Sequence, residues 1–228
     1  MTDVQPYAFG RAAAEPAAAA AIGGLDKLGD RLARKLRALI EPYCGSRPGV
    51  TAKAPDNTMF MMWDACVPSF VSLSLYRLLP MKGVVTLRID ATLISQLVDR
   101  FYGGRGNSSP AEKIEFTPTE TRLINRLSGQ IMSAVVDSWA EITRLEPILA
   151  SRETGIAQAE IMAADADVVV QSFEVDLGVK EKFLIEIVYP HEGLAGIEMP
   201  AGTRRVEEPK VRDAVWQAQL ESRALQVR

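Results

Sequence analysis

Apolar side chains recur at helical spacing in two long stretches of the chain. The first stretch, over about 23–43, places leucine or isoleucine at i, i+3 and i+4 positions and keeps its basic residues off the apolar stripe. The second begins at TPTE (117–120), where Thr117 suits an N-cap and Glu120 suits the reciprocal bond of a capping box. Its apolar seam continues to about residue 145 and is wide enough for a central core helix. The pattern therefore predicts two long amphipathic helices.

Shorter segments alternate apolar and polar residues, as strands do when one of their faces is buried. Two pairs of such segments are separated by short turns, and each pair predicts a β-hairpin. A helix over 91–102 follows the first hairpin, and the proline-initiated turn PHEGLAGI follows the second. The segments expected to be strands are 50–54, 59–63, 70–78 with 83–90 as the first hairpin, and 168–178 with 181–189 as the second.

A unit of strand, turn, strand and helix therefore occurs twice, which is the pattern of a duplicated half-unit. We predict an α/β (α+β) sandwich with internal pseudo-twofold symmetry and long central helices. Residues 1–22 contain an alanine run and two prolines but few large apolar side chains, so they are interpreted as a flexible arm. The folded domain is expected over 23–200, and residues 201–228 are expected to form a C-terminal linker and helix.

The charge and composition of the chain argue against several classes of function. Its 228 residues include 26 basic and 29 acidic side chains, a formal net charge of −3, so no nucleic-acid partner is expected. No window holds 18 uncharged apolar residues, and the N-terminus lacks the basic and apolar regions of a leader, so we expect a soluble chain that is not exported. Cys44 and Cys66 stand in dissimilar contexts without C-x-x-C spacing, which favours buried, reduced thiols.

Residues that carry common catalytic or metal chemistry are sparse. His191 is the only histidine, so a Ser/His/Asp triad or a histidine metal site has no support, and we expect neither a metal nor a cofactor. The GGRG sequence at 103–106 follows a predicted helix and lacks the G-K-[ST] ending of a phosphate-binding loop. No catalytic residue is therefore assigned.

The stretch FYGGRGN (101–107) concentrates glycine directly after a predicted helix. One interpretation is local: Gly103 is the C′ residue in the left-handed region, and Gly104 and Gly106 form the following turn. The other is functional: a loop without Cβ atoms lets a partner approach its backbone, and Arg105 can find an acceptor there. The two interpretations are compatible, because a turn can also be an interface.

The chain resembles the middle domain of the flagellar motor switch protein family FliM in three segments: FYGGRGN, FTPTETRLINRLSGQIMSAVVDSWAEI, and VVVQSFEVDLG…FLIEIVYP. The resemblance runs from the N-terminal PYAF to VWQ near the C-terminus. It implies a CheC-like fold and a non-enzymatic role in the cytoplasmic ring of the flagellar rotor at the inner membrane, where chemotaxis signals set the direction of rotation. It also implies that Gly103, Gly104, Arg105 and Gly106 contact FliG. The further partners that it implies are FliN or a FliN-like protein, neighbouring copies of the chain and, weakly, phosphorylated CheY.

Two features that the resemblance leads us to look for are not found in this sequence. Proteins of the FliM family usually begin with a segment that resembles L-S-Q-x-E-I-D and captures phosphorylated CheY. Residues 1–10 of this sequence read MTDVQPYAFG and do not resemble that segment. The chain ends at RALQVR, where a FliN-like domain is expected to begin. We therefore expect no CheY capture by an N-terminal tail, and a FliN-like domain that is either truncated here or supplied by another protein.

An enzymatic alternative comes from the CheC and CheX phosphatases, which resemble FliM in fold. The active site that this resemblance implies is a helix with Glu and Asn three residues apart, whose side chains together hold the attacking water. Here Glu120 and Asn125 are five residues apart, about 140° around a helix, and cannot share a substrate. A CheY-phosphate phosphatase therefore stays the alternative, and an unrelated interaction domain of a secretion apparatus is a third.

Overall fold

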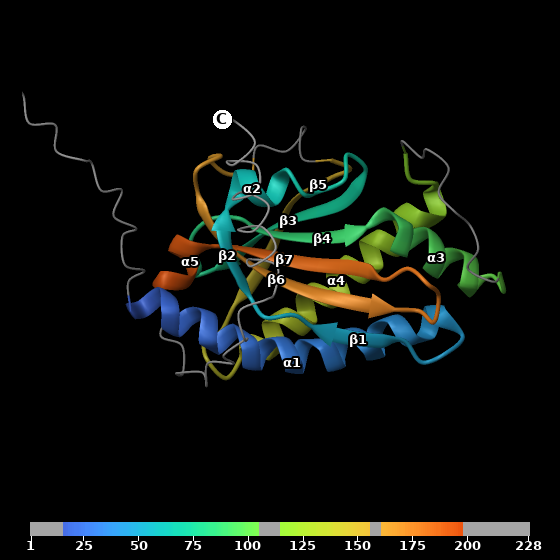
Figure 1. The fold of residues 1–228 in the computed structure, drawn as a ribbon, viewed down its shortest axis with the longest axis horizontal. Helices are drawn as coiled ribbons and strands as arrows, with labels where there is room; N and C mark the ends of the chain where they lie inside the picture. Colours follow the sequence, from blue (N-terminus) through green and yellow to red (C-terminus); the bar gives the residue numbers. More distant parts are fainter. Residues whose placement is uncertain (1–15, 105–114, 156–160, 198–228) are drawn as a thin grey trace, which may run out of the picture.

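The computed structural model describes residues 16–104, 115–155 and 161–197, which form one antiparallel sheet with helices on both of its faces (Figure 1). Among the described helices, none combines the length and the apolar composition needed to cross a membrane. The helices are α1 (Pro16–Cys44), α2 (Phe60–Asp64), α3 (Ala91–Phe101), α4 (Pro118–Trp139) and α5 (His191–Ala195). The strands are β1 (Gly49–Ala52), β2 (Asp56–Met59), β3 (Val71–Leu79), β4 (Val85–Asp90), β5 (Glu146–Glu153), β6 (Asp167–Asp176) and β7 (Phe183–Pro190).

The sheet joins the two predicted hairpins at its centre. Its strand order is β1-β6-β7-β4-β3-β5, and β2 also pairs with β6. The hairpin β3–β4 leads into α3 and the hairpin β6–β7 leads into α5, while β4 pairs antiparallel with β7, where Arg88 faces Glu186. Two strand–strand–helix units thus meet at an approximate twofold axis between β4 and β7. The predicted fold class, a mixture of helices and antiparallel strands, is confirmed.

Each half of the domain also contributes strands to the other half. β1 and β2 precede the first hairpin along the chain but pair with β6 of the second, whereas β5 precedes the second hairpin but pairs with β3 of the first. Main-chain hydrogen bonds therefore cross between the halves at both edges of the sheet. Because the halves share one sheet and both contribute to the hydrophobic clusters on its two faces, they form a single domain.

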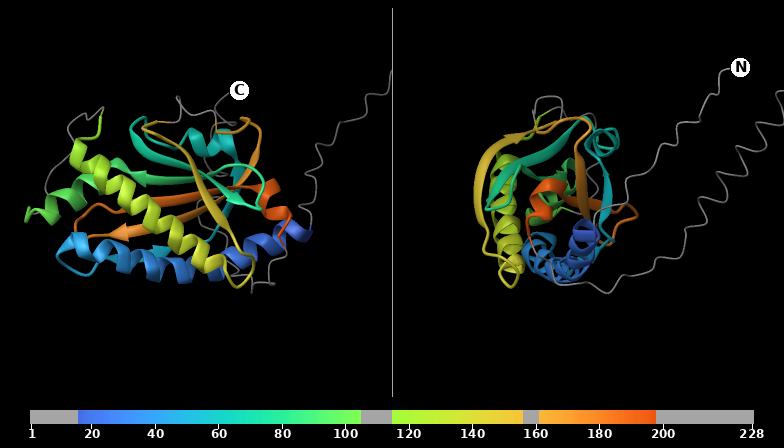
Figure 2. Two further views of the ribbon diagram at one scale, coloured as in Figure 1. Left: turned by 180° about the vertical axis from the view of Figure 1, so that it is seen from behind. Right: turned by 90° about the vertical axis from the view of Figure 1, so that its left-hand side faces the viewer.

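The two long helices lie on the same face of the sheet and pack on each other (Figure 2). Their apolar stripes are buried, which explains the helical spacing of leucine and isoleucine in the sequence. On the exposed flank of the helix pair, Arg31 forms an ion pair with Glu141 at 2.7 Å, and Lys35 forms one with Asp137 at 3.2 Å. Exposed ion pairs add little stability, so burial of the stripes holds the helices together. The stripe residues include Leu25, Leu28, Leu32, Leu36 and Ile40 on α1 and Leu127, Ile131, Val135 and Trp139 on α4.

Helix α4 begins with the predicted capping box. The Glu120 amide donates to the Thr117 hydroxyl at 3.3 Å, and the Thr117 amide donates to the Glu120 carboxylate at 2.9 Å. The Glu120 side chain is buried, and the Ser95 hydroxyl of α3 donates to it at 2.6 Å. The capping box therefore also forms a polar link between α3 and α4.

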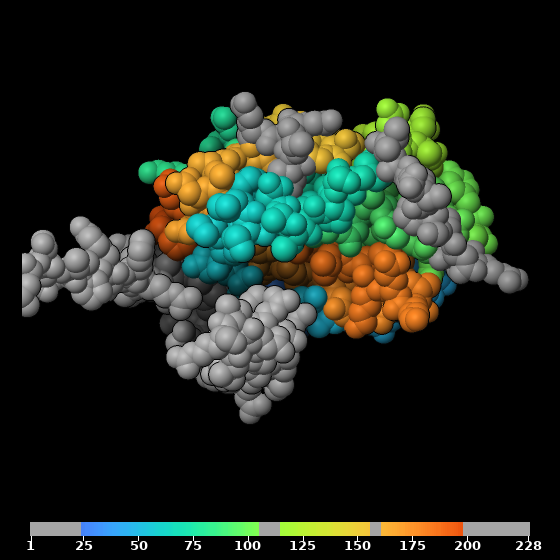
Figure 3. Space-filling view, turned by 45° about the horizontal axis from the view of Figure 1, so that its top comes forward, coloured from blue at the N-terminus to red at the C-terminus, as the bar shows by residue number. Residues whose placement is uncertain are grey.

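The opposite face of the sheet carries α2, which belongs to the cyan part of the surface in Figure 3, and beneath it lies a buried charged network. Arg88 donates to Glu186 and to Asp90, each at 2.6 Å, and the Trp63 indole donates to Glu186 at 3.0 Å. Burial raises the pKa of the Asp90 carboxyl, although Arg88 and the Leu184 amide oppose this shift. The network joins β4, β7 and α2 around the centre of the sheet.

Two predicted elements near the N-terminus differ from the structure. Helix α1 begins at Pro16, inside the predicted arm, because alanine has the highest helix propensity and proline suits a first helical turn. The predicted strand over 59–63 is mostly the helix α2. Phe60 and Trp63 are buried three residues apart, and Met61 and Met62 between them are exposed. A short apolar run does not distinguish a strand from a helix, so the pattern misled here.

Two further differences follow the second long helix. The predicted end near residue 145 is wrong, because α4 ends at Trp139 and a turn precedes β5. Strand β5 was not predicted at all. It forms an edge of the sheet and its residues are largely exposed, so it has no buried face for an alternating pattern to reveal.

Candidate functional site

Helix α3 ends in a glycine turn with the hydrogen bonds of a Schellman motif. The Gly103 amide donates to the Arg100 carbonyl at 2.9 Å, and the Gly104 amide donates to the Asp99 carbonyl at 2.8 Å. Gly103 has a φ of 86°, in the left-handed region that glycine adopts without a Cβ penalty. The predicted role of Gly103 as the C′ residue is confirmed.

Gly104 is glycine for a different reason. Its φ lies outside the left-handed region, but a Cβ at this position would overlap the carboxylate of Asp99. Both glycines are exposed, so the turn presents bare main chain at the surface. Arg105 and Gly106, the other two residues of the predicted site, lie outside the described residues, and their part in it stays a prediction.

Two aromatic side chains lie exposed immediately before this turn. Phe101 is 60% exposed and Tyr102 is 70% exposed. Their rings meet edge to face with centroids 5.4 Å apart, and the Phe101 ring lies 6.0 Å from the ring of Tyr43 on α1. Clustered aromatic residues at a surface are typical of protein interfaces. The pair FY is visible in the sequence, but its exposure was missed because the apolar period of α3 extends to Phe101.

These aromatic residues border a groove of about 170 Å³, here called the α3 groove, between the C-terminal ends of α1 and α3 and the N-terminal part of α4. Helix α3 lies at the right-hand end of the molecule in Figure 1. The half-buried Val98 and the buried Leu123 give the groove an apolar lining, and two exposed arginines of α4 stand beside them. The lining residues are Tyr43, Val98, Phe101, Tyr102, Thr119, Arg122, Leu123 and Arg126.

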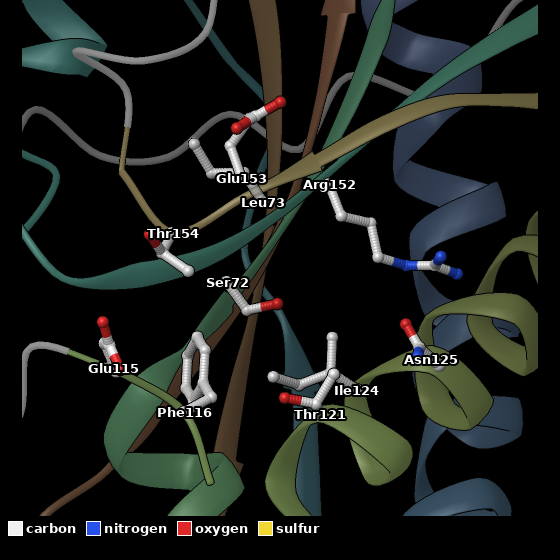
Figure 4. Close-up of a pocket in the computed structure, with 10 residues that line it drawn as sticks. All are labelled: Ser72, Leu73, Glu115, Phe116, Thr121, Ile124, Asn125, Arg152, Glu153 and Thr154. Carbon is white, nitrogen blue, oxygen red and sulfur yellow. The ribbon is translucent and has the colours of Figure 1, made fainter. Parts of the chain in front are cut away.

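A second cavity, of about 320 Å³, lies between α4 and the strands β3 and β5 (Figure 4). Asn125 of α4 and Arg152 of β5 extend into it, with the Phe116 ring at one side. Glu120 is not among its lining residues, because its carboxylate is turned to Ser95 and to the capping box. Glu120 and Asn125 therefore face different surroundings, as their spacing predicts. The other lining residues are Ser72, Leu73, Glu115, Thr121, Ile124, Glu153 and Thr154.

The remaining candidate residues have surroundings that the structure defines. Cys44 is buried, and burial raises the pKa of its thiol to about 11, which keeps it protonated and unreactive near neutral pH. Cys66 is exposed, so the prediction that both thiols are buried is wrong for it. His191 is half-buried as the first residue of α5. In the part of the chain that the structure describes, no group of three His, Cys, Asp or Glu side chains is placed to hold a metal ion.

The family model of the flagellar motor switch protein FliM matches residues 20–202. The chain belongs to the FliM family. The FliM protein of Pseudomonas aeruginosa is 32% identical over 106 residues, which are 46% of this chain and 33% of that protein. The chain spans between 33% and 51% of the lengths of the curated FliM relatives that it matches.

Solved structures of FliM middle domains share this fold. The FliM middle domain of Vibrio alginolyticus matches with a TM-score of 0.67 and 24% identity, covering 76% of this chain and 96% of that one. A chain in the FliG–FliM complex of H. pylori matches with a TM-score of 0.69 and 20% identity, covering 77% of this chain and 97% of that one. The sheet order and the helix layer described above are therefore those of a FliM middle domain.

Proposed function

We propose that this chain is a non-enzymatic component of the flagellar motor switch and that it binds FliG through the turn at the end of α3. The contact residues are Gly103, Gly104, Arg105 and Gly106. Membership of the FliM family supports the proposal, as does the likeness to a chain of the FliG–FliM complex of H. pylori. Through this contact the chain would pass chemotaxis signals to the part of the rotor that sets the direction of rotation.

The observation that carries the proposal is the exposed, hydrogen-bonded turn at Gly103 and Gly104. Its amides donate hydrogen bonds to carbonyl groups in the last turn of α3, so these bonds fix the backbone conformation of the turn in the free protein. A preorganised loop loses less conformational entropy on binding. Neither glycine carries a Cβ, so a partner can approach the main chain closely, and Phe101 and Tyr102 add exposed apolar surface beside it.

The same role involves further partners and a location. We propose FliN or a FliN-like protein and neighbouring copies of the chain in a ring as partners, and phosphorylated CheY as a weak partner that binds the folded domain. The location that goes with this role is the cytoplasmic side of the inner membrane, in the flagellar basal body. Family membership supports each of these proposals.

The non-enzymatic part of the proposal rests on the hydrogen bonds of the Glu120 carboxylate. This carboxylate accepts hydrogen bonds from Thr117 and Ser95, whereas Asn125 lines a separate cavity, so the two side chains do not converge on one water. The decay of CheY-phosphate should therefore be unchanged by a stoichiometric amount of this chain. Acceleration of that decay would overturn the non-enzymatic assignment in favour of the phosphatase alternative.

Calorimetric titration of the purified chain with FliG from the same organism tests the main proposal. A saturable complex is the expected result. Absence of binding by calorimetry and of co-elution in gel filtration would contradict it, provided that circular dichroism shows both proteins to be folded.

A further inference from the structure

The α3 groove has the size and lining for one apolar side chain. Its volume of about 170 Å³ is close to that of a cavity of about 150 Å³ that holds benzene. Aromatic rings of Tyr43, Phe101 and Tyr102 form one border, and Val98 and Leu123 add aliphatic surface. An aromatic or branched aliphatic side chain of a partner would therefore bury its apolar surface here.

Two positively charged side chains stand on the other border of the groove. Arg122 and Arg126 are exposed, and among the residues that the structure describes neither has a hydrogen-bond or ion-pair partner. They are four residues apart on one helix, where like charges repel. The basic residues Arg31 and Lys35 of α1, by contrast, are neutralised by acidic partners within the domain. The whole chain carries a net charge of −3, so two adjacent guanidinium groups without an ion-pair partner among the described residues mark a local site for carboxylates.

The groove is continuous with the turn proposed above as the FliG contact. Phe101 and Tyr102 line the groove and immediately precede Gly103 and Gly104 in the chain. A partner segment that lies on the bare main chain of the turn therefore reaches the groove without a gap. This continuity connects the apolar and charged features to one bound protein.

We infer that the α3 groove receives one apolar side chain of FliG and that Arg122 and Arg126 bind carboxylates flanking that side chain. This inference rests on the proposed FliG contact and names the chemistry of its partner segment, which is acidic with an apolar anchor. Two consequences distinguish it from contact at the glycine turn alone. The affinity falls as salt screens the charges, and it depends on side chains of α4 as well as on the loop.

The test measures the FliG affinity of two double variants that exchange the same charges at different places. The first, Arg122→Glu with Arg126→Glu, reverses the charge of the groove; glutamate is a good helix former, so the helix is retained. The control, Arg34→Glu with Arg144→Glu, reverses two exposed arginines, one on α1 about 14 Å along the helix from Tyr43 and the other beyond the far end of α4. A third variant, Phe101→Ala, removes the apolar border at a side chain that is largely exposed.

We expect at least tenfold weaker FliG binding for the groove double variant and for Phe101→Ala, and a change of less than twofold for the control. The wild-type affinity should fall between low and high salt, and the groove double variant should lose most of this dependence. Unchanged melting temperatures would show that each variant is folded. If FliG binds the wild type and the groove variants equally well, the inference is overturned while the proposed function stands. If FliG does not bind the wild-type chain, the proposed function fails and the inference fails with it.

Discussion

Replacing Gly103 by alanine tests whether the end of α3 is built as described. The φ of 86° at this residue belongs to the left-handed region, where a Cβ crowds the neighbouring carbonyl oxygen. Among the residues that the structure describes, apart from its two chain neighbours, no atom lies within 4 Å of the position that the new Cβ would take, so the backbone conformation sets the cost. We expect Gly103→Ala to lower the free energy of unfolding by about 1–2 kcal/mol.

A matched control for this variant is Gly129→Ala in the middle of α4. Gly129 is also exposed and has open space around its missing Cβ, but its backbone is helical. Alanine there should raise the free energy of unfolding by about 0.5–1 kcal/mol, because glycine is the more flexible residue in the unfolded chain. The same substitution therefore has opposite signs at the two glycines. Gly104→Ala should also lower the free energy of unfolding, because the Asp99 carboxylate has to move away from the new Cβ.

Thermal and urea unfolding, followed by circular dichroism, measure these differences. For a chain of this size, 1 kcal/mol corresponds to roughly 2–4 °C in melting temperature, so Gly103→Ala should melt about 2–8 °C below the wild type. Gly129→Ala should melt above it. A Gly103→Ala variant as stable as the wild type would refute the left-handed C′ assignment and the preorganised turn on which the proposed interface depends.

The remaining predictions concern the capping box, the loop and the thiols. Glu120→Ala should lower the free energy of unfolding by about 2–3 kcal/mol in a urea titration, because it removes the buried carboxylate that accepts hydrogen bonds from Thr117 and Ser95; a loss below 1 kcal/mol would contradict this. Arg105→Ala should weaken FliG binding by roughly 1–3 kcal/mol without changing the melting temperature, and unaltered affinity would move the contact elsewhere. Iodoacetamide at pH 8 should label Cys66 and spare Cys44, whose thiol pKa of about 11 leaves it protonated. Mass spectrometry of the labelled native protein measures this, and labelling of Cys44 but not of Cys66 would contradict the prediction.

Local chemistry accounts for the elements that the sequence predicted well. Successive side chains of a strand point to opposite faces of the sheet, and the alternating apolar residues of the two hairpins are buried in the clusters on those faces. Thr117 and Glu120 form their capping box within four residues. Gly103 follows from the need for a left-handed residue after α3. Each of these signals lies within one element and its nearest neighbours, so it can be read without the rest of the fold.

Features that depend on distant segments could not be predicted. Strand β5 is held by its pairing with β3 and shows no alternation of its own, and nothing local indicates that β1 pairs with β6 across the domain. The α3 groove has the same origin, because Tyr43, Phe101 and Arg126 come from three helices that meet only in the folded chain. The sequence thus located the glycine turn but not the aromatic and basic surface beside it.

Hydrogen exchange of the chain with and without FliG tests the central claim most directly. The account predicts that FliG slows amide exchange in peptides covering residues 98–106 and the N-terminal part of α4, while peptides from α5 at the other end of the domain are unchanged. Protection confined to α5 or to the exposed edge strand β5, with none at the end of α3, would contradict the proposed FliG interface.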